Sequence, residues 1–182
     1  MENRNQTSYT IRKGTVQDLD QIAAIYDRIL TSEEQGKTVI GWIRGIYPTE
    51  DTAIEALKAD ELFVMESNKT VVAAARINQI QVPEYANANW KWEAEDNQIM
   101  VLHTLVVDPL CAGHGYGSAF VKFYEEYAKE KGCLVLRIDT NARNKTARRL
   151  YSHLGYREAD IVPCQFNGIP NVQLVCLEKE CN

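Results

Sequence analysis

The sequence predicts an α/β (α+β) fold built on a mixed, mostly antiparallel central sheet of about six or seven strands flanked by helices. Segments rich in β-branched residues recur along the chain, and segments with apolar residues at helical spacing separate several of them. Short turns join some strands and make those pairs antiparallel, whereas a helix joins two others and makes that pair parallel. The expected order is strand, two helices, three strands, helix, strand, helix and two strands.

The chain should begin with a strand and a helix. Residues 8–12 alternate between polar and apolar side chains, as a half-buried strand does. Thr15 and Asp18 resemble a capping box, with Asp in the usual place of Glu. Residues 33–48 are mixed in character and have no assignment. The apolar residues of the first helix fall on one stripe: Val16, Leu19, Ile22, Ala23, Tyr26, Ile29 and Leu30.

A second helix and a hairpin are expected next. Thr49 should cap a short helix that ends near Ala59. The apolar segments 62–65 and 71–75 flank a short polar turn, which is the pattern of a β-hairpin. Residues 81–97 are rich in Trp, Tyr, Asn and Glu and form a long loop, and loops of that length are often functional.

Residues 102–118 predict a strand, a glycine-rich loop and the start of a helix. Pro109 cannot continue a central strand, so the strand should end near Asp108. From Ser118 the apolar residues recur at helical spacing. Backbone N–H groups that converge at a helix N-terminus without side chains above them form a site for an anion, most often a phosphate. The glycines that leave these groups bare are Gly113, Gly115 and Gly117.

The last third of the chain alternates strands with one more helix. The glycine-loop helix should end at Gly132, and residues 134–139 form the next strand. Asn144 caps the following helix, and Gly155 closes it at the position where a left-handed residue is common. Two strands remain on either side of a turn at 167–170: residues 156–166 and 172–179.

Composition places the chain among ordinary globular proteins, with 182 residues, 45% hydrophobic and 25% charged. We expect a single domain over residues 1–182, without repeats or linkers. The net charge of −5 disfavours nucleic acid and anionic membranes as partners. No segment approaches the roughly 20 apolar residues of a membrane span, and residues 1–6 are polar, without a signal-peptide core. Five cysteines without a C-x-x-C pair indicate reduced thiols in a cytoplasmic protein, and no metal is expected.

Two segments together resemble the GNAT superfamily, the Gcn5-related N-acetyltransferases. The first is Leu105-x-Val107-x-Pro109 with the glycine loop, which looks like the acetyl-CoA signature of that family. The second is Leu136-Arg137-Ile138-Asp139-Thr140 with Asn144, Ala147, Leu150-Tyr151 and Gly155-Tyr156. The resemblance runs from near Tyr9 to near Glu178. It implies a splayed pair of parallel strands that holds acetyl-CoA as co-substrate, with the amide near Val107 polarising the acetyl carbonyl.

The resemblance assigns a set of residues to cofactor binding. One departure is Ala112, which stands where the family usually has Arg or Gln to hold the loop or its phosphate. His114 could supply a positive charge there if it is protonated, although an exposed side chain without a fixed role is the simpler interpretation. The implied cofactor-binding residues are Leu105, Val106, Val107, Gly113, His114, Gly115, Tyr116, Gly117, Ser118, Asn144, Ala147 and Tyr151.

The implied reaction needs an acid and a base. Tyr151 shares a helix face with Asn144 and Ala147, and by resemblance its phenol returns a proton to the thiolate. His103 titrates near neutrality and, at a period of two, should share a strand face with Leu105 and Val107. It is the candidate base or water-positioning group, and the alternatives are a buried, hydrogen-bonded histidine or a direct contact with the substrate. Other candidate bases lie in the preceding loop: Glu93, Glu95 and Asp96.

The acceptor site should be built from the early helices and the long loop. Aromatic residues there could line an amine pocket through cation–π contacts, or could simply pack in the core. The candidates are Trp42, Tyr47, Tyr85 and Trp90, with Trp92 beside them.

The sequence therefore predicts an acetyl-CoA-dependent N-acetyltransferase that acts by direct transfer in a ternary complex. The acceptor is a primary amine of a small molecule, an amino acid, a polyamine or a peptide N-terminus. The alternatives are a CoA-binding sensor or interaction module with little catalysis, and an acyltransferase that uses a longer acyl-CoA. A homodimer stays open, because many relatives pair through their last strands.

Overall fold

The computed structural model of the chain describes residues 8–182, so the polar segment 1–6 lies outside the described residues. The strands and longer helices follow the order expected from the sequence. They are β1 (Thr10–Lys13), α1 (Leu19–Glu34), α2 (Glu50–Lys58), β2 (Leu62–Ser67), β3 (Thr70–Asn78), β4 (Ile99–Val107), α3 (Tyr116–Glu130), β5 (Val135–Asn141), α4 (Lys145–His153), β6 (Arg157–Phe166) and β7 (Ile169–Glu180). Four short 3-10 helices complete the list: η1 (Val16–Asp18), η2 (Pro83–Asn87), η3 (Asp96–Gln98) and η4 (Pro109–Cys111).

The seven strands form one sheet in the order β1-β2-β3-β4-β5-β7-β6. All neighbours are antiparallel except β4 and β5, which α3 connects as a crossover. This arrangement confirms the predicted fold class and the position of the one parallel pair. The capping box of Thr15 with Asp18 and the cap of α4 by Asn144 are also present.

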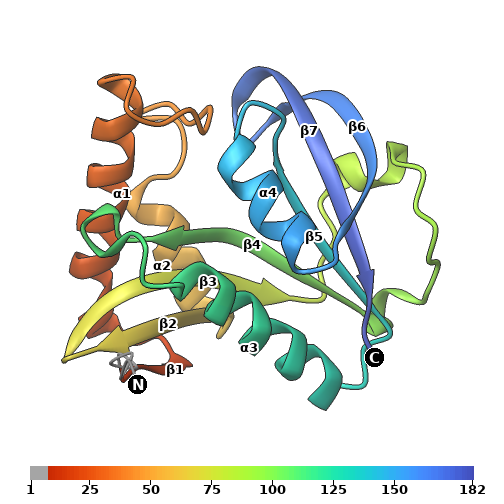
Figure 1. Cartoon of the computed structure of the whole chain (residues 1–182), viewed down its shortest axis with the longest axis horizontal. Coiled ribbons are helices and arrows are strands. Elements are labelled where there is room, and N and C mark those ends of the chain that lie inside the picture. Colours follow the sequence, from red (N-terminus) through yellow and green to blue (C-terminus); the bar gives the residue numbers. More distant parts are fainter. Residues whose placement is uncertain (1–7) are drawn as a thin grey trace, which may run out of the picture.

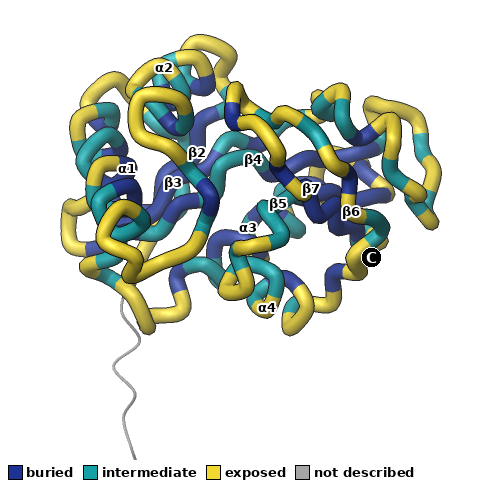
Figure 2. The backbone as a smooth tube through the Cα atoms, turned by 90° about the horizontal axis from the view of Figure 1, so that it is seen from above, coloured by how far each residue is buried: buried dark blue, intermediate teal, exposed yellow. Residues whose placement is uncertain are grey.

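Helices cover both faces of the sheet. On one face, aromatic residues of α3 and Tyr151 of α4 join the core with β2, β3 and β4. On the other face, α1 and α2 pack on alternate residues of the same strands, such as Val64 and Ala74. Figure 2 shows the strands as the mostly buried middle of the molecule and the connecting loops as its exposed outside. Helices therefore cover both faces of the sheet, and a ligand can reach the strands only where two neighbouring strands separate.

That gap opens between β4 and β5. Their parallel pairing runs only from Ile99 opposite Val135 to Leu102 opposite Ile138. Beyond this point the strands diverge, and Figure 1 shows the β5–β7 half of the sheet turning away from the β1–β4 half. The backbone of β4 from Thr104 to Val107 therefore has no strand partner on the side of β5.

A β-bulge in β4 lies at the start of the gap. Thr104 has a left-handed φ of 51°, and the register with β3 shifts there, so that His103 lies opposite Arg76 but Val106 lies opposite Ala74. Because Ala74 and Arg76 are on the same face of β3, His103 and Val106 share a face. The prediction that His103 shares a face with Leu105 and Val107 is therefore wrong, since one extra residue in a strand reverses the alternation that follows it.

Several boundaries differ from those predicted. β4 begins three residues earlier than expected, at Ile99. α3 begins at Tyr116 rather than Ser118, because the chain turns at Gly115, whose φ is 75°. The last hairpin turns on Asn167 and Gly168 alone, both with positive φ, so β7 already begins at Ile169. The loop 81–97 contains the short helix η2.

Candidate active site

Two cavities meet where β4 and β5 part. The apolar cavity, of about 470 Å³, lies between the two strands and reaches the beginnings of the glycine loop and of α4. The polar cavity, of about 440 Å³, lies beside it between α2, β3 and the segment that precedes η2. The residues that line both cavities are Tyr47, Thr104, Asp139, Phe166 and Asn167. A molecule in one cavity can therefore touch a molecule in the other at Thr104 and Asp139.

The apolar cavity passes through the sheet. Leu105, Val107 and Tyr151 line it and belong to the packing on the α3 and α4 face. Val106 and Trp42 also line it, but they belong to the packing on the α1 face. Three successive residues of β4 thus present both faces of the strand to one cavity. The predicted cofactor residues Leu105, Val106 and Val107 are brought together here with Asn144 and Ala147.

The glycine loop stands at one end of the apolar cavity, which Pro109 and Ala112 line. Gly113 and Gly115 have φ of 82° and 75°, and a Cβ on either would meet nothing within 4 Å. Their amides are therefore bare and precede the N-terminus of α3, as an anion site requires. Gly117 has a different role, because its Cβ would lie 3.3 Å from Leu150, so this glycine lets α3 approach α4 closely.

His114 is exposed and turns toward its own loop. Its Nδ1 lies 3.1 Å from the carbonyl oxygen of Cys111, and its ring stacks on Tyr116 at 5.5 Å. Tyr116 is buried and donates a hydrogen bond to Ser67. The side chain of Tyr116 is therefore a structural anchor, and its place at the helix N-terminus leaves only its backbone for an anion.

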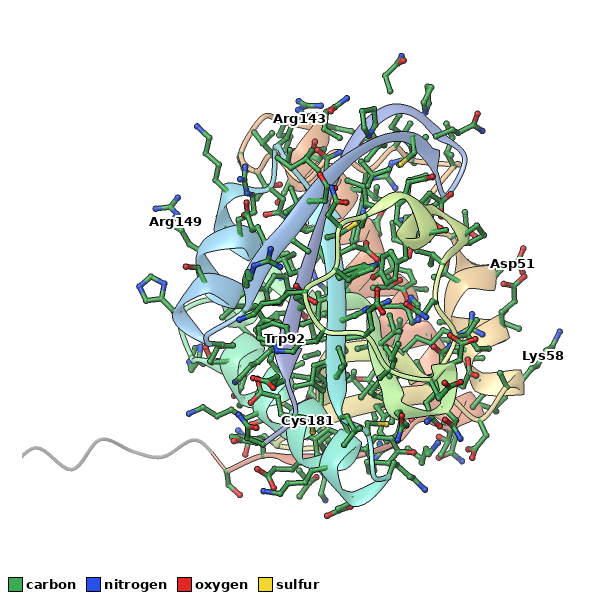
Figure 3. The ribbon with its side chains drawn as sticks, turned by 90° about the vertical axis from the view of Figure 1, so that its right-hand side faces the viewer. Asp51, Lys58, Trp92, Arg143, Arg149 and Cys181 are labelled. Carbon is green, nitrogen blue, oxygen red and sulfur yellow. The ribbon has the colours of Figure 1, made fainter. Side chains whose placement is uncertain are left out.

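An ion pair that the sequence did not predict holds the same loop. Arg28 of α1 donates to both carboxylate oxygens of the buried Asp108, at 2.9 and 2.6 Å. Asp108 also accepts from the backbone N–H of Leu110. The pair ties α1 to the start of the glycine loop and balances a negative charge that would otherwise repel an anion there. Figure 3 shows two further cations, Arg143 and Arg149, extending outward on either side of the start of α4.

Tyr151 lies on the wall of the apolar cavity. Asn144 caps α4 by accepting a hydrogen bond from Ala147 N at 3.1 Å, and Ala147 and Tyr151 follow on the same face. The three residues thus reach the cavity together, as their spacing predicted. Tyr151 is buried, burial raises the pKa of its phenol, and within residues 8–182 the hydroxyl has no hydrogen-bond partner. The phenol keeps its proton and can donate it inside the cavity.

His103 lies in the wall of the polar cavity. Its Nε2 is 2.8 Å from Oδ1 of Asn78, whose amide group donates in turn to Glu61. Burial, assisted by the neighbouring charge of Arg76, lowers the pKa of His103 to about 4. An imidazole with that pKa is a weak base at neutral pH. His103 is thus a half-buried, hydrogen-bonded histidine in the cavity wall, and its role as a base stays a prediction.

Asp139 is the carboxylate at the junction of the two cavities, and the sequence motifs gave it no separate role. Tyr85 donates a hydrogen bond to its Oδ2 at 2.6 Å, and burial raises the pKa of the carboxyl to about 6. No lysine or arginine within residues 8–182 forms an ion pair with it. The signal in the sequence was a single carboxylate at the end of the predicted strand 134–139.

The predicted acceptor aromatics divide into two groups. Trp42 and Tyr47 line the apolar cavity with their rings 5.7 Å apart, and the hydroxyl of Tyr47 bonds to Thr104. Tyr85 lies behind Asp139 and lines neither cavity. Trp90 lines neither cavity as well, because it packs on Tyr85 at 5.1 Å and beneath the guanidinium of Arg137 at 4.0 Å. These two rings support the site from the core.

The alternative bases of the preceding loop do not reach either cavity. Glu93, Glu95 and Asp96 are exposed. Asp96 accepts a hydrogen bond from Gln81 at 2.8 Å, and Glu95 caps η3. Their side chains therefore hold the loop in place at the surface.

The polar cavity carries a negative charge. Asp51 and Glu55 of α2 line it together with Asp139, and Figure 3 shows Asp51 extending outward from the helix. Its cation Arg76 is neutralised by Glu61, with Nε 2.5 Å from the carboxylate. An ammonium group is therefore attracted into this cavity, whereas a carboxylate is repelled.

Two general properties of the described residues bear on cofactors and location. No helix within residues 8–182 is long and apolar enough to cross a membrane. In the same residues, no group of three or more His, Cys, Asp or Glu side chains is placed to hold a metal ion.

Comparison with a curated relative gives a match over most of the chain. An uncharacterized N-acetyltransferase of Methanocaldococcus jannaschii is 27% identical over 158 residues, which is 85% of this chain. The match spans 63% of the length of that relative.

Solved structures share the fold at low sequence identity. An acetyltransferase of the GNAT family from Streptococcus agalactiae matches with a TM-score of 0.78 and 18% identity, over 94% of this chain and 95% of the other. YncA of Salmonella typhimurium, whose structure contains its cofactor acetyl-CoA, matches with a TM-score of 0.68 and 17% identity, over 96% and 94%. The profile of the acetyltransferase (GNAT) family matches residues 39–156, which include β4, the glycine loop, β5 and α4. The chain belongs to this family.

Proposed function

We propose that this protein is an acetyl-CoA-dependent N-acetyltransferase that moves an acetyl group to a primary amine by direct transfer. The observation that carries the proposal is the junction of the two cavities at Thr104 and Asp139. One cavity begins at an anion site and follows an unpaired strand edge, as a long phosphate-bearing cofactor requires. The other is negatively charged, as a site for an ammonium group requires.

The residues of the apolar cavity fit acetyl-CoA, which supplies an activated acetyl group when bound. The bare amides of Gly113 and Gly115 at the start of α3 suit its pyrophosphate. The edge of β4 from Thr104 to Val107 offers backbone N–H groups to the pantetheine arm and to the acetyl carbonyl. One preorganised donor to a developing oxyanion is worth roughly 3 kcal/mol of barrier. Ala112 contributes no charge, and Arg28 balances the nearby Asp108 instead.

Asp139 is proposed as the base that takes a proton from the acceptor ammonium. Its carboxylate lines both cavities, and Tyr85 holds one of its oxygens. A carboxyl with a pKa of about 6 is ionised at neutral pH, yet it is a stronger base than an ordinary aspartate. Because it lacks a cation of its own, an incoming ammonium supplies the missing partner.

Tyr151 is proposed as the acid that returns a proton to the sulfur of the leaving thiolate. Its hydroxyl reaches the apolar cavity and makes no competing hydrogen bond within the described residues. In the complete reaction the acceptor ammonium loses two protons, one to Asp139 and solvent, and one that balances the proton given to the thiolate. No acyl-enzyme intermediate is needed, because the two cavities let donor and acceptor meet directly.

The acceptor class follows from the charge of the polar cavity. A cationic amine of a small molecule, a polyamine or a peptide N-terminus fits the three carboxylates Asp51, Glu55 and Asp139. A free amino acid fits less well, because its carboxylate is repelled by the same groups. We also propose a cytoplasmic location, which the free thiols of all five cysteines support.

The test combines cofactor binding with turnover in two tyrosine variants. Acetyl-CoA at 100 times its dissociation constant should stabilise the folded protein by about 2.7 kcal/mol, measured as a shift of the thermal midpoint. Tyr151→Phe should keep this shift but lose amine-dependent CoA release, followed with a thiol reagent over spermidine, tyramine and a peptide with a free N-terminal alanine.

The matched control is Tyr156→Phe. The ring of Tyr156 lies 6.0 Å from that of Tyr151, but its hydroxyl is buried, has no hydrogen-bond partner within residues 8–182, and lines neither cavity. This control should keep both binding and turnover. The absence of a shift with acetyl-CoA would refute the transferase, and a shift without CoA release by the wild type would favour a binding module.

A further inference from the structure

We propose that the apolar cavity continues past the position of the thioester into an acyl-chain pocket, so that the protein binds donors with short linear acyl groups longer than acetyl. This inference rests on the proposed function only in taking this cavity as the site of a CoA thioester. It concerns six side chains, here called the acyl chamber, that the proposed transfer of an acetyl group leaves without a role: Ile29, Ile40, Trp42, Ile169, Val172 and Leu174.

The acyl chamber is uniformly apolar and comes from three separate elements. Ile29 belongs to α1, Ile40 and Trp42 to the loop that follows it, and Val172 and Leu174 to β7. Ile29, Val172 and Leu174 are almost fully buried, with exposed fractions of 6%, 5% and 1%. These side chains attract an aliphatic chain, and the polar residues Ser32, Thr38 and Asn141 also line the same cavity.

The chamber lies on the far side of the sheet from the CoA site. The glycine loop, Asn144 and Tyr151 mark the α3 and α4 face, where the cofactor enters. Trp42 packs instead with Val106 on the α1 face, beyond the unpaired edge of β4. A chain that follows the cavity from the glycine loop passes the edge of β4 and then reaches the chamber.

The polarity of each cavity determines which part of the substrates it accepts. The exposed residues Asp51 and Glu55 of α2 line the polar cavity, which reaches the junction from that helix. The acyl chamber belongs to the apolar cavity, where the acyl-CoA donor binds, and neither Asp51 nor Glu55 lines that cavity. An extension of the acyl group therefore enters the chamber, while the acceptor amine arrives from the polar side.

The chamber can bury an acyl chain against apolar side chains. Apolar surfaces from three elements surround it, and each methylene that an acyl chain buries contributes about 0.8 kcal/mol, close to a fourfold gain in affinity. Propionyl-, butyryl- and hexanoyl-CoA should therefore bind progressively more tightly, until the chamber is filled.

The experiment measures binding, by calorimetry and by thermal shift, of CoA and of its acetyl, propionyl, butyryl and hexanoyl thioesters. In the wild type the affinity should rise by about fourfold for each of the first added methylenes. Ile40→Trp fills the chamber from a loop whose backbone is held by Glu33, which accepts from Ile40 N and Gly41 N. This variant should bind acetyl-CoA like the wild type and lose the gain with chain length.

The matched control is Val39→Trp, at a neighbouring residue that is 48% exposed and does not line the cavity. It should keep the chain-length dependence. Val172→Ile adds one methyl to the chamber from the other side and should shorten the optimal chain, which keeps the test decisive if Ile40→Trp does not fold.

The outcomes separate this inference from the proposed function. If acetyl-CoA binds and longer thioesters bind equally or more weakly, the acyl chamber is refuted and the acetyltransferase stands. If only longer thioesters bind, the chamber is supported and acetyl-CoA is not the donor. If no thioester binds, both proposals fail.

Discussion

The two cavities differ in the elements that build them as much as in their polarity. Residues of α2, β3 and the segment before η2 build the polar cavity, whereas α1 with its loop, β7 and α4 build the apolar one. They share the junction, where Thr104 on β4 and Asp139 on β5 belong to both, together with Tyr47, Phe166 and Asn167. Substitutions in the polar cavity can therefore change which acceptor binds without changing donor binding, and substitutions in the apolar cavity can change donor binding without affecting the acceptor. Chemistry common to both substrates must depend on the junction.

The substitution Asp139→Asn is expected to have the largest effect, because it should strongly reduce transfer while leaving donor binding in the apolar cavity intact. The amide keeps the size of the carboxylate but cannot accept the proton of an ammonium group, so turnover should fall by roughly 10²- to 10⁴-fold. Binding of acetyl-CoA should change little, because the rest of the apolar cavity is intact. The measurement is amine-dependent CoA release as a function of pH, with calorimetric binding of acetyl-CoA as the control. A variant that keeps both its rate and the acidic limb of its pH profile would show that the base lies elsewhere.

The same substitution should stabilise the fold at alkaline pH. Burial raises the pKa of Asp139 to about 6 from an ordinary value of 3.8. The contribution of this carboxyl to stability is therefore fully present below pH 4 and is lost as the pH rises through 6 and the carboxyl ionises. This shift corresponds to about 3 kcal/mol. Asp139→Asn should unfold at higher denaturant concentration than the wild type at pH 8, and at a similar concentration at pH 4. Equal stability at both pH values would contradict a raised pKa.

The contrast between Asp139 and His103 also shows what could be predicted from the sequence. Regular patterns predicted the helices and the parallel pair, because burial on one face repeats along each element. They placed Asn144, Ala147 and Tyr151 on one wall of the cavity for the same reason. The bulge at Thr104 has no such pattern, and it reverses the face of every residue after it. His103 therefore lies on a different face from Leu105 and Val107.

Contacts between residues that are far apart in the chain also could not be predicted from the sequence. Tyr85 and Asp139 are 54 positions apart and meet because the loop before β4 lies across β5 and β7. Trp90 looked suited to an amine pocket by its chemistry, yet it packs on Tyr85 because Arg137 and Glu178 hold its loop against the sheet. Chemical type alone did not distinguish a ring that lines a cavity from one that supports it.

The smallest effect is expected from His103→Gln. Glutamine can still donate a hydrogen bond to Asn78, as Nε2 of the histidine does, so turnover between pH 7 and pH 8 should stay within a fewfold of the wild type. Because burial lowers the pKa of His103 to about 4 from 6.5, the wild type loses stability as the pH falls from about 6.5 toward 4, and the variant should lose less. The measurements are the pH profile of turnover and denaturant unfolding at pH 5 and pH 8. If the acidic limb of turnover instead disappears in this variant and persists in Asp139→Asn, the base belongs to β4 in the polar cavity, and the junction serves only to position the two substrates.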